Sequence, residues 1–325
     1  MSASTGKLTD QKVLIFDVYG TLMDWETGLY NGLKPLLSKF AASKGWSRKE
    51  ALEAFGSVEG DIQSQFPEML YADVLAKCHE VLEERLKALS SQETSAASST
   101  LQGQLDSSVV DTEGASSSTS AAATAPGGEE SSSHKGFGNS IRNWPIFPDS
   151  SSALHSLARH YKLVVLSNVD RDSFQYTHGV LSEGQTPQDP TPYLNPSESD
   201  NPHKYWHPGP KSPFTLILTA QDTGCYKPAL GGFQTALEYI KTHSDLLGGT
   251  LKEDEDVKSK VLIVAQSLPH DHVPASQLGI KSVWIDRQSA VTCNTLPGQA
   301  KPWSWKFETL GELAEVVEKE LKEAS

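Results

Sequence analysis

The chain has 325 residues, of which 37% are hydrophobic and 21% charged, an apolar content that excludes a wholly disordered protein. Its net charge is −13 (28 basic residues minus 41 acidic ones), which disfavours nucleic acid and anionic membranes as partners. No apolar run approaches the ~20 residues that cross a bilayer, the polar first residues lack a secretory signal, and the three distant cysteines fit a reducing compartment, so we expect a cytoplasmic protein.

Short apolar runs bounded by polar residues predict strands that are buried on both faces. These runs are Val13–Phe16, Leu163–Leu166, Leu216–Leu218, Val261–Ala265 and Ser282–Ile285. The helical patterns that lie between or after them are Ser150–His160, Gly232–Thr242, Pro274–Leu278 and Thr309–Lys322. This alternation predicts an α/β fold with a doubly wound, Rossmann-like parallel sheet, whose active site lies beyond the carboxyl ends of the strands.

A helical segment interrupts this alternation directly after the first strand. Apolar residues recur at helical spacing from residue 26 to about residue 90, and no strand pattern separates them. We therefore interpret residues 26–143 as a helical domain inserted into an α/β core made of residues 1–25 and 144–325. The stretch 90–133 is rich in Ser, Ala, Thr and Gly and has no aromatic residue, so we expect a disordered insertion over about 90–140.

Proline is concentrated in residues 186–213, which hold eight of the 18 prolines. This density excludes a helix or a central strand and predicts an irregular surface insertion within the core. Tyr193, Tyr205 and Trp206 are the residues that we expect to hold it against the neighbouring surface.

Polar residues of specific kinds follow the predicted strands. Asp17 comes directly after the first strand and is costly to bury unless it is paired or belongs to a site. The later strands are followed by Ser167 and Asn168, by Lys227, and by Asp271. A carboxylate paired with a lysine can form a covalent ester, and a second carboxylate can activate the water that cleaves it. The sequence contains no glycine-rich phosphate loop of the P-loop or dinucleotide type and no G-x-S-x-G elbow.

Four short motifs carry a more specific signal. They are Phe16-Asp17-Val18-Tyr19-Gly20-Thr21-Leu22 with Asp24 after it, Leu166-Ser167-Asn168, Tyr226-Lys227-Pro228, and the stretch from Ala265 to His272 that contains Asp271. Together they resemble the haloacid dehalogenase superfamily. The D-x-Y-G-T-L form is most similar to the type II L-2-haloacid dehalogenases, and A-Q-S-L-x-H-D-H to their fungal-type variant. The resemblance covers about residues 1–25 and 144–290.

This resemblance implies an α/β hydrolase with a helical cap that closes over the strand ends and excludes water. It implies that Asp17 attacks the halogen-bearing carbon of a small 2-haloalkanoic acid and forms an aspartyl ester. Lys227 would balance the charge on Asp17, and Asp271 would position or activate the hydrolytic water. The residues that would hold the substrate carboxylate and the leaving halide are Tyr19, Ser167 and Asn168.

The family resemblance also bears on cofactors and partners. Phosphatases of the superfamily carry a second Asp two residues after the nucleophile, near Mg²⁺, where this chain has Tyr19. Tyrosine is a poor Mg²⁺ partner and a weak acid, so carbon–halogen chemistry without a cofactor or metal is favoured over a Mg²⁺-dependent phosphatase. The predicted partner is a small-molecule substrate, and a homodimer is compatible with the sequence.

Three positions depart from the family pattern and leave a catalytically silent binding relative as an alternative. Leu268 stands where the family has Asn, and Phe233 stands where it usually has Tyr. The cap arginine that helps to bind halide has no clear counterpart, because Arg48 lies in a capping-box pattern at a helix start. His270 and His272 are interpreted as loop histidines rather than metal ligands.

Overall fold

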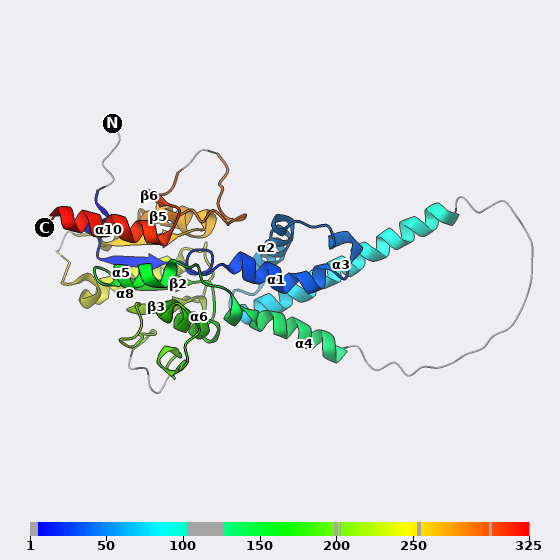
Figure 1. Ribbon diagram of the computed structural model, residues 1–325, viewed down its shortest axis with the longest axis horizontal. Coiled ribbons are helices and arrows are strands. Elements are labelled where there is room, and N and C mark those ends of the chain that lie inside the picture. Colours follow the sequence, from blue (N-terminus) through cyan, green and yellow to red (C-terminus); the bar gives the residue numbers. More distant parts are fainter. Residues whose placement is uncertain are drawn as a thin grey trace, which may run out of the picture.

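A six-stranded parallel sheet lies at the centre of the core (Figure 1). Its strands are β1 (Val13–Phe16), β2 (Lys162–Ser167), β3 (Leu216–Thr219), β4 (Val261–Ala265), β5 (Lys281–Ile285) and β6 (Trp305–Phe307). They lie in the order β3-β2-β1-β4-β5-β6, and every neighbouring pair is parallel. The computed structural model describes residues 6–102, 127–197, 201, 203–251, 255–298 and 301–324.

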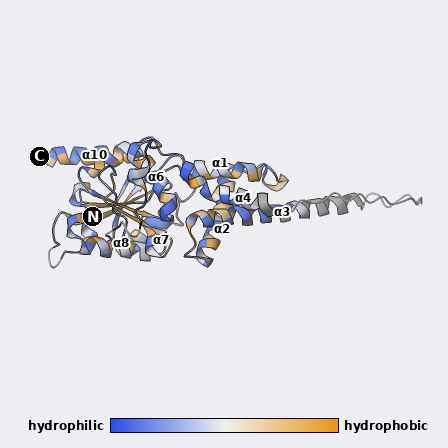
Figure 2. Cartoon of the chain, turned by 90° about the horizontal axis from the view of Figure 1, so that it is seen from below, coloured by the Kyte–Doolittle hydropathy of each residue, from blue (hydrophilic) through white to orange (hydrophobic). Residues whose placement is uncertain are grey.

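The two faces of this sheet pack against different helices. The core helices are α5 (Ser150–Ala158), α6 (Arg171–Glu183), α7 (Ala220–Thr223), α8 (Gly231–Thr242), α9 (Val273–Leu278) and α10 (Leu310–Ala324). Leu14 and Phe16 belong to an apolar cluster with α5, α6 and α10, whereas Val13 and Ile15 belong to a second cluster with α8 and α9. Figure 2 shows the apolar strands enclosed by these helices. The predicted doubly wound α/β fold is confirmed.

Four helices extend away from the sheet on the side of the carboxyl ends of its strands (Figure 1). They are α1 (Trp25–Leu37), α2 (Arg48–Gln65), α3 (Tyr71–Gln102) and α4 (Gly127–Gly138), and we call them the cap. Leu33 of α1, Phe55 of α2 and Leu75 of α3 are buried in the same cluster as Phe16, so apolar packing is continuous from the cap into the core. Within the described part of the chain, every helix is too short or too polar to span a bilayer.

The cap helices extend into the range that was expected to be disordered. α3 continues to Gln102 and α4 begins at Gly127, whereas residues 103–126 lie outside the described residues. Residues 90–102 contain neither Gly nor Pro, so a helix that is already nucleated by its packed first turns can propagate through them. The high content of Ser, Ala and Thr in residues 90–102 predicted disorder, although the helix continues through them.

Three core elements were missed by the sequence patterns: β6, α6, and α7, which is a single turn of four residues. β6 is a short edge strand whose residues are only partly buried, so it lacks the continuous apolar signal of its neighbours. α6 buries polar residues, among them Thr177 and His178, and therefore shows no clean apolar stripe. Its boundary signals are nevertheless present, because Asp170 caps its first turn and Gly184 ends it in the left-handed conformation.

The described residues of the proline-rich segment 186–213, which leave out 198–200 and 202, are irregular apart from one short 3₁₀ turn, Thr191–Tyr193. Tyr193, Tyr205 and Trp206 are buried, and Trp206 pairs with Ile217 of β3 through an isolated antiparallel bridge. These aromatic side chains therefore fasten the segment to the core, as expected.

Gly20 occupies a backbone conformation that other residues adopt only under strain, in the tight turn after β1. Its φ is +103°, and a Cβ atom there would lie 3.0 Å from Trp25 and 3.1 Å from Gln266. We expect Gly20→Ala to lower the free energy of unfolding by about 1–3 kcal/mol in urea titrations. The matched control is Gly45→Ala, where nothing lies within 4 Å of the added methyl group. An equal loss of stability in both variants would contradict this account.

Candidate active site

The polar side chains that follow the strands meet at one edge of the sheet. Asp17 follows β1, and Asp271 lies in the helical turn Leu268–His272 after β4. Lys227 reaches both from the loop between α7 and α8. Their exposed fractions are 8%, 2% and 4%, respectively, so these charges are compensated mainly by one another rather than by water.

The Lys227 ammonium joins the two carboxylates. Its Nζ donates to Asp17 Oδ1 at 2.7 Å and to Asp271 Oδ1 at 2.8 Å. The third bond goes to the carbonyl oxygen of Leu166 at 3.0 Å. Because an ammonium has three hydrogens, all of its donors are used and the charge is fixed between the two acids.

Thr21 holds the second oxygen of Asp17, a role that its place in the turn motif did not disclose. Its Oγ1 donates to Asp17 Oδ2 at 2.6 Å and accepts from the backbone N–H of Gln266 at 2.8 Å. Gln266 follows β4, so this hydroxyl links the ends of two adjacent strands through the carboxylate. Both oxygens of Asp17 are therefore oriented by donors from the protein.

Asn168 positions the lysine. Its Oδ1 accepts from the backbone N–H of Lys227 at 2.7 Å, and its Nδ2 donates to the Lys227 carbonyl oxygen at 3.0 Å. The side chain lines the cavity, but its amide is committed to this backbone. The contact explains why an amide suits the position, because it offers a donor and an acceptor side by side.

Tyr19 and Ser167 differ in their access to the site. Tyr19 lines the cavity, but its hydroxyl is hydrogen-bonded to Thr177 at 2.8 Å, and burial raises its pKa above the ordinary value. Ser167 lies outside the cavity lining, and its buried Oγ has no hydrogen-bond partner among the described residues. In this arrangement Tyr19 lines the cavity with its hydroxyl already hydrogen-bonded, and Ser167 does not line it.

Two carboxylates share one ammonium, and this imbalance sets their protonation. Burial alone would lower the pKa of Lys227, but Asp17 and Asp271 outweigh it, so its pKa lies above the usual value. The pKa of Asp271 is raised to about 7, because burial raises it more than Lys227 lowers it and the charge of Asp17 also raises it. Asp271 Oδ2 has no partner among the described residues, which leaves this oxygen available to a water molecule or a substrate.

A cavity of about 420 Å³ lies between the cap and the strand ends. On the core side Asp17, Lys227 and Asp271 line it. The lining residues contributed by α2 and α3 are Lys49, Leu52, Glu53, Gly56, Glu59, Gly60, Gln63 and Tyr71. No arginine is among the lining residues in the described part of the chain, and the lysines that line the cavity are Lys49 and Lys227.

Glu59 of α2 is a cavity residue that the sequence did not single out. It accepts a hydrogen bond from the Tyr71 hydroxyl at 2.8 Å. Burial raises its pKa to about 7, although that hydrogen bond lowers it. Only the helical register that turns Glu59 toward the strand ends could have identified it, because a single Glu on a helix is commonly a solvated residue.

Arg48 of α2 does not line the cavity but is linked to a core loop through Glu26 of α1. It pairs with Glu26 at 3.2 Å, next to the capping box that Ser47 forms with Glu50. Glu26 in turn accepts hydrogen bonds from the backbone N–H groups of Val291 and Thr292, which line the cavity. Arg48 thus lies at the start of α2, as expected, and its ion pair with Glu26 connects it indirectly to the wall of the cavity.

The two histidines around Asp271 bond to separate partners. His272 is buried, with Nδ1 hydrogen-bonded to Ser282 and Nε2 to the carbonyl oxygen of Ala265. His270 Nδ1 bonds to Ser267 Oγ at 2.9 Å. Since both ring nitrogens of His272 are used within the core, this pair does not converge on a common point as metal ligands would.

Solved structures with this arrangement of sheet and cap match almost the whole chain. The L-2-haloacid dehalogenase from Xanthobacter autotrophicus with chloropropionic acid covalently bound is 14% identical, with 95% of this chain and 98% of that chain covered and a TM-score of 0.54. The L-2-haloacid dehalogenase PA0810 is 15% identical, with coverages of 94% and 99% and a TM-score of 0.53. This chain has the haloacid dehalogenase fold.

The same dehalogenase fold also occurs in the HAD-hydrolase YfnB from Bacillus subtilis bound to magnesium, at 14% identity, coverages of 95% and 99%, and a TM-score of 0.50. No protein-family model and no curated protein matches the sequence. The predicted haloacid dehalogenase-type fold is confirmed, and the chemistry has to be argued from the residues of the site.

Asp271 is expected to make the stability of this dehalogenase fold depend on pH. Its pKa is about 7 in the folded chain and about 3.9 when unfolded, so the folded state binds more protons between these values. The contribution of Asp271 to the free energy of unfolding therefore falls as pH rises from about 4 to 7 and levels off above. Urea titrations should show the wild type losing up to about 1.4 kcal/mol per pH unit relative to Asp271→Asn. A difference that stays constant with pH would contradict the raised pKa.

Proposed function

We propose that this chain is a hydrolase that cleaves the carbon–halogen bond of a small 2-haloalkanoic acid through an ester on Asp17. In the first step a carboxylate oxygen of Asp17 bonds to carbon 2, and the carbon–halogen electron pair leaves with the halide. In the second step water attacks the carbonyl carbon of the ester and gives a proton to Asp271. The bond between this carbon and the oxygen on carbon 2 then breaks, that oxygen takes the proton from Asp271, and the carboxyl group left on Asp17 loses its proton to solvent. The products are a 2-hydroxy acid, halide and the free Asp17 carboxylate.

The contact between Asp17 and Lys227 is the observation that supports this proposal most directly. A nucleophilic carboxylate must be ionised and held with an oxygen directed at the reacting carbon. Lys227 at 2.7 Å supplies a positive charge and a hydrogen-bond donor to one carboxylate oxygen, and Thr21 at 2.6 Å fixes the orientation of the other. Both carboxylate and ammonium line the cavity, so a small substrate can reach them.

The charges of Asp17, Lys227 and Asp271 support the assignment of the first step to Asp17 and of the second step to Asp271. The negative charge of Asp17 contributes to the raised pKa of Asp271. When Asp17 becomes an ester that charge disappears, and Lys227 is left with Asp271 as its only carboxylate partner. The pKa of Asp271 then falls, so Asp271 becomes ionised at the stage at which water has to lose a proton.

A Mg²⁺-dependent phosphatase of the same fold is the alternative, because the arginine-free lining would suit a substrate whose charge is met by a bound cation. The residues fit this function less well. Asp17 and Asp271 each commit one oxygen to Lys227, whereas Mg²⁺ requires several free oxygen ligands in octahedral geometry. Tyr19 holds the place of the phosphatase acid, and its hydroxyl is bonded to Thr177.

The first activity prediction concerns halide release. The purified chain should release chloride from 2-chloropropionate in the presence of a chelator, and Asp17→Asn should reduce kcat/KM at least ~10³-fold because the nucleophile is lost. The matched control is Asp61→Asn, which removes an exposed carboxylate of α2 and should leave the rate unchanged. Ion chromatography of halide gives the measurement.

Two outcomes would replace this proposal. Phosphate release from phosphate esters in Mg²⁺, without halide release, would support the phosphatase. The absence of both activities, with no covalent adduct on Asp17, would support a binding relative that has no catalysis.

The second activity prediction concerns the intermediate. Asp271→Asn should slow hydrolysis of the ester by ~10²–10⁴-fold, because it removes the general base, while leaving the first step possible. Mass spectrometry of quenched, digested protein should then find the substrate-derived mass on the peptide that contains Asp17. The Asp17→Asn/Asp271→Asn double variant should carry no adduct; an adduct in that variant would place the nucleophile elsewhere.

A further inference from the structure

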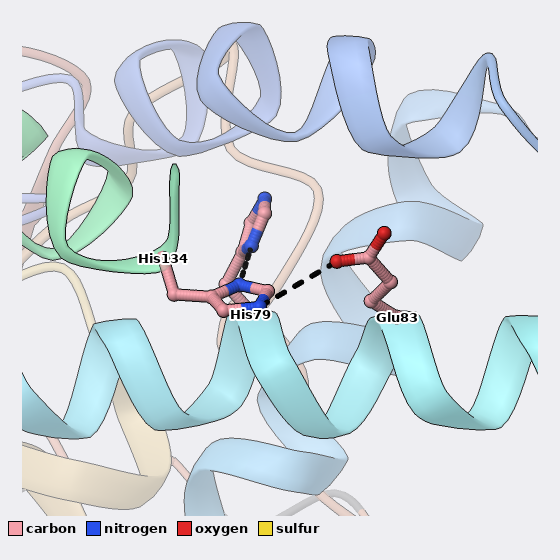
Figure 3. Close-up of side chains that lie close together, drawn as sticks. All are labelled: His79, Glu83 and His134. Carbon is pink, nitrogen blue, oxygen red and sulfur yellow. Dashed lines mark hydrogen bonds and ion pairs between the residues drawn. The ribbon is translucent and has the colours of Figure 1, made fainter. Parts of the chain in front are cut away.

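A second group of titratable side chains lies in the cap, apart from the cavity. His79 and Glu83 come from α3 and His134 comes from α4, and their ligand atoms all lie within 4.8 Å of one another (Figure 3). Of the residues described, this is the one such cluster of three or more His, Cys, Asp or Glu. His79 is 4% and Glu83 5% exposed, so two of the three groups are well shielded from water.

The spacing of the α3 residues suits a shared ligand. His79 and Glu83 are four residues apart, which places them one above the other on the same face of the helix. His134 reaches this face from the neighbouring helix, with its ring between the two (Figure 3). The helices approach closely enough that a Cβ on Gly138 of α4 would lie 2.3 Å from the carbonyl oxygen of Ala72 of α3.

The contacts within the cluster leave metal-ligating atoms directed at one another. The Nδ1 atoms of His79 and His134 are 2.7 Å apart, and His134 Nε2 lies 3.6 Å from Glu83 Oε2. Two imidazole nitrogens at this distance share one hydrogen, so at least one of the two Nδ1 atoms has a free lone pair and acts as an acceptor. The other carboxylate oxygen, Glu83 Oε1, faces Lys39 at 3.4 Å and Lys87 at 3.7 Å, which leaves Oε2 on the histidine side.

We propose that His79, Glu83 and His134 form a binding site for one divalent transition-metal ion, with Zn²⁺ as the best match. Two imidazoles and one carboxylate are a common protein ligand set for Zn²⁺, with water completing the tetrahedron. Zinc–nitrogen bonds of 2.0–2.1 Å place two nitrogens ~3.3 Å apart, so the rings need to separate by about half an ångström. The His134 ring also has to turn, because it contacts His79 through Nδ1 and Glu83 through Nε2, and only one of these nitrogens can ligate the shared ion. The hydrogen between the two Nδ1 atoms moves on binding to the other nitrogen of the same ring, because a neutral imidazole that ligates a metal through one nitrogen carries its hydrogen on the other.

The ion would join α3 to α4 across a long stretch of chain. His79 and His134 are 55 positions apart in sequence, and the residues between them include 103–126. A metal that binds the folded cap but not the unfolded chain stabilises the fold in proportion to its affinity. The site is therefore structural, and it is independent of the proposed chemistry at Asp17.

The test is zinc binding by the full-length chain after treatment with a chelator. We expect one Zn²⁺ per chain in a competition titration with a chromophoric chelator, and Co²⁺ should give the visible absorption of a tetrahedral site. His79→Gln and His134→Gln should each weaken binding at least tenfold. Zn²⁺ should raise the melting temperature of the wild type and leave that of His134→Gln unchanged.

Two further variants guard against misfolding and unspecific binding. Glu83→Gln keeps both imidazoles and the helix contact, so it should fold and still bind Zn²⁺ more weakly than the wild type. His207→Gln is the matched control, because His207 lies near His203 in the core and bonds to the Tyr239 hydroxyl at 2.8 Å, away from the cap. The proposal is overturned if the wild type binds Zn²⁺ no more tightly than the cap variants, or if His207→Gln loses binding to the same extent.

Discussion

The buried lysine between two buried carboxylates is the interaction on which the rest of this site depends. A single buried carboxylate would be too costly to leave ionised, and a single buried ammonium would lose its proton. Placed together they stabilise each other's charges, but the sum of two acids and one base is still −1. One carboxyl group must therefore carry most of the cost, and it is Asp271, the more deeply buried of the two.

The sheet topology is what brings these charges together. β1 lies between β2 and β4, so the residues after these three strands converge at one edge. β1 supplies Asp17, β2 supplies Asn168 and the Leu166 carbonyl, and the segment after β4 supplies Asp271. Arg287 holds the turn after β1 in place, because its guanidinium donates two hydrogen bonds to the carbonyl oxygen of Thr21. The order of these three strands thus brings the side chains of the site together at one edge of the sheet.

The sequence predicted the parts of this structure whose signals are local. Apolar runs identified five of the six strands, since a strand that is buried on both faces has no polar position to hide it. Asp17 and Lys227 could be identified because a charge beside a buried strand demands a partner. β6 and α6 were missed because their burial is partial or is provided by polar side chains.

The roles of some site residues could not be predicted, because the signals that determine them are not local in the sequence. Asn168 and Ser167 were both expected to bind substrate, but the fold commits the Asn168 amide to the Lys227 backbone and places Ser167 outside the cavity lining. Those outcomes depend on side-chain directions at the end of β2, which the pattern of residue types does not encode. Glu59 depends likewise on how α2 is turned above the strand ends.

The number of acidic residues in the cavity overstates its negative charge. Glu53, Glu59 and Asp271 lie in the same cavity as Asp17, so a 2-haloalkanoate, itself an anion, would meet four carboxyl groups and no arginine among the described lining residues. However, burial raises the pKa of both Glu59 and Asp271 to about 7. Near neutral pH each is protonated for a substantial fraction of the time, and a protonated carboxyl group carries no charge and gains an O–H donor. The cavity therefore repels an anion less than four ionised carboxyl groups would, and it can offer a carboxylate hydrogen-bond donors without an arginine.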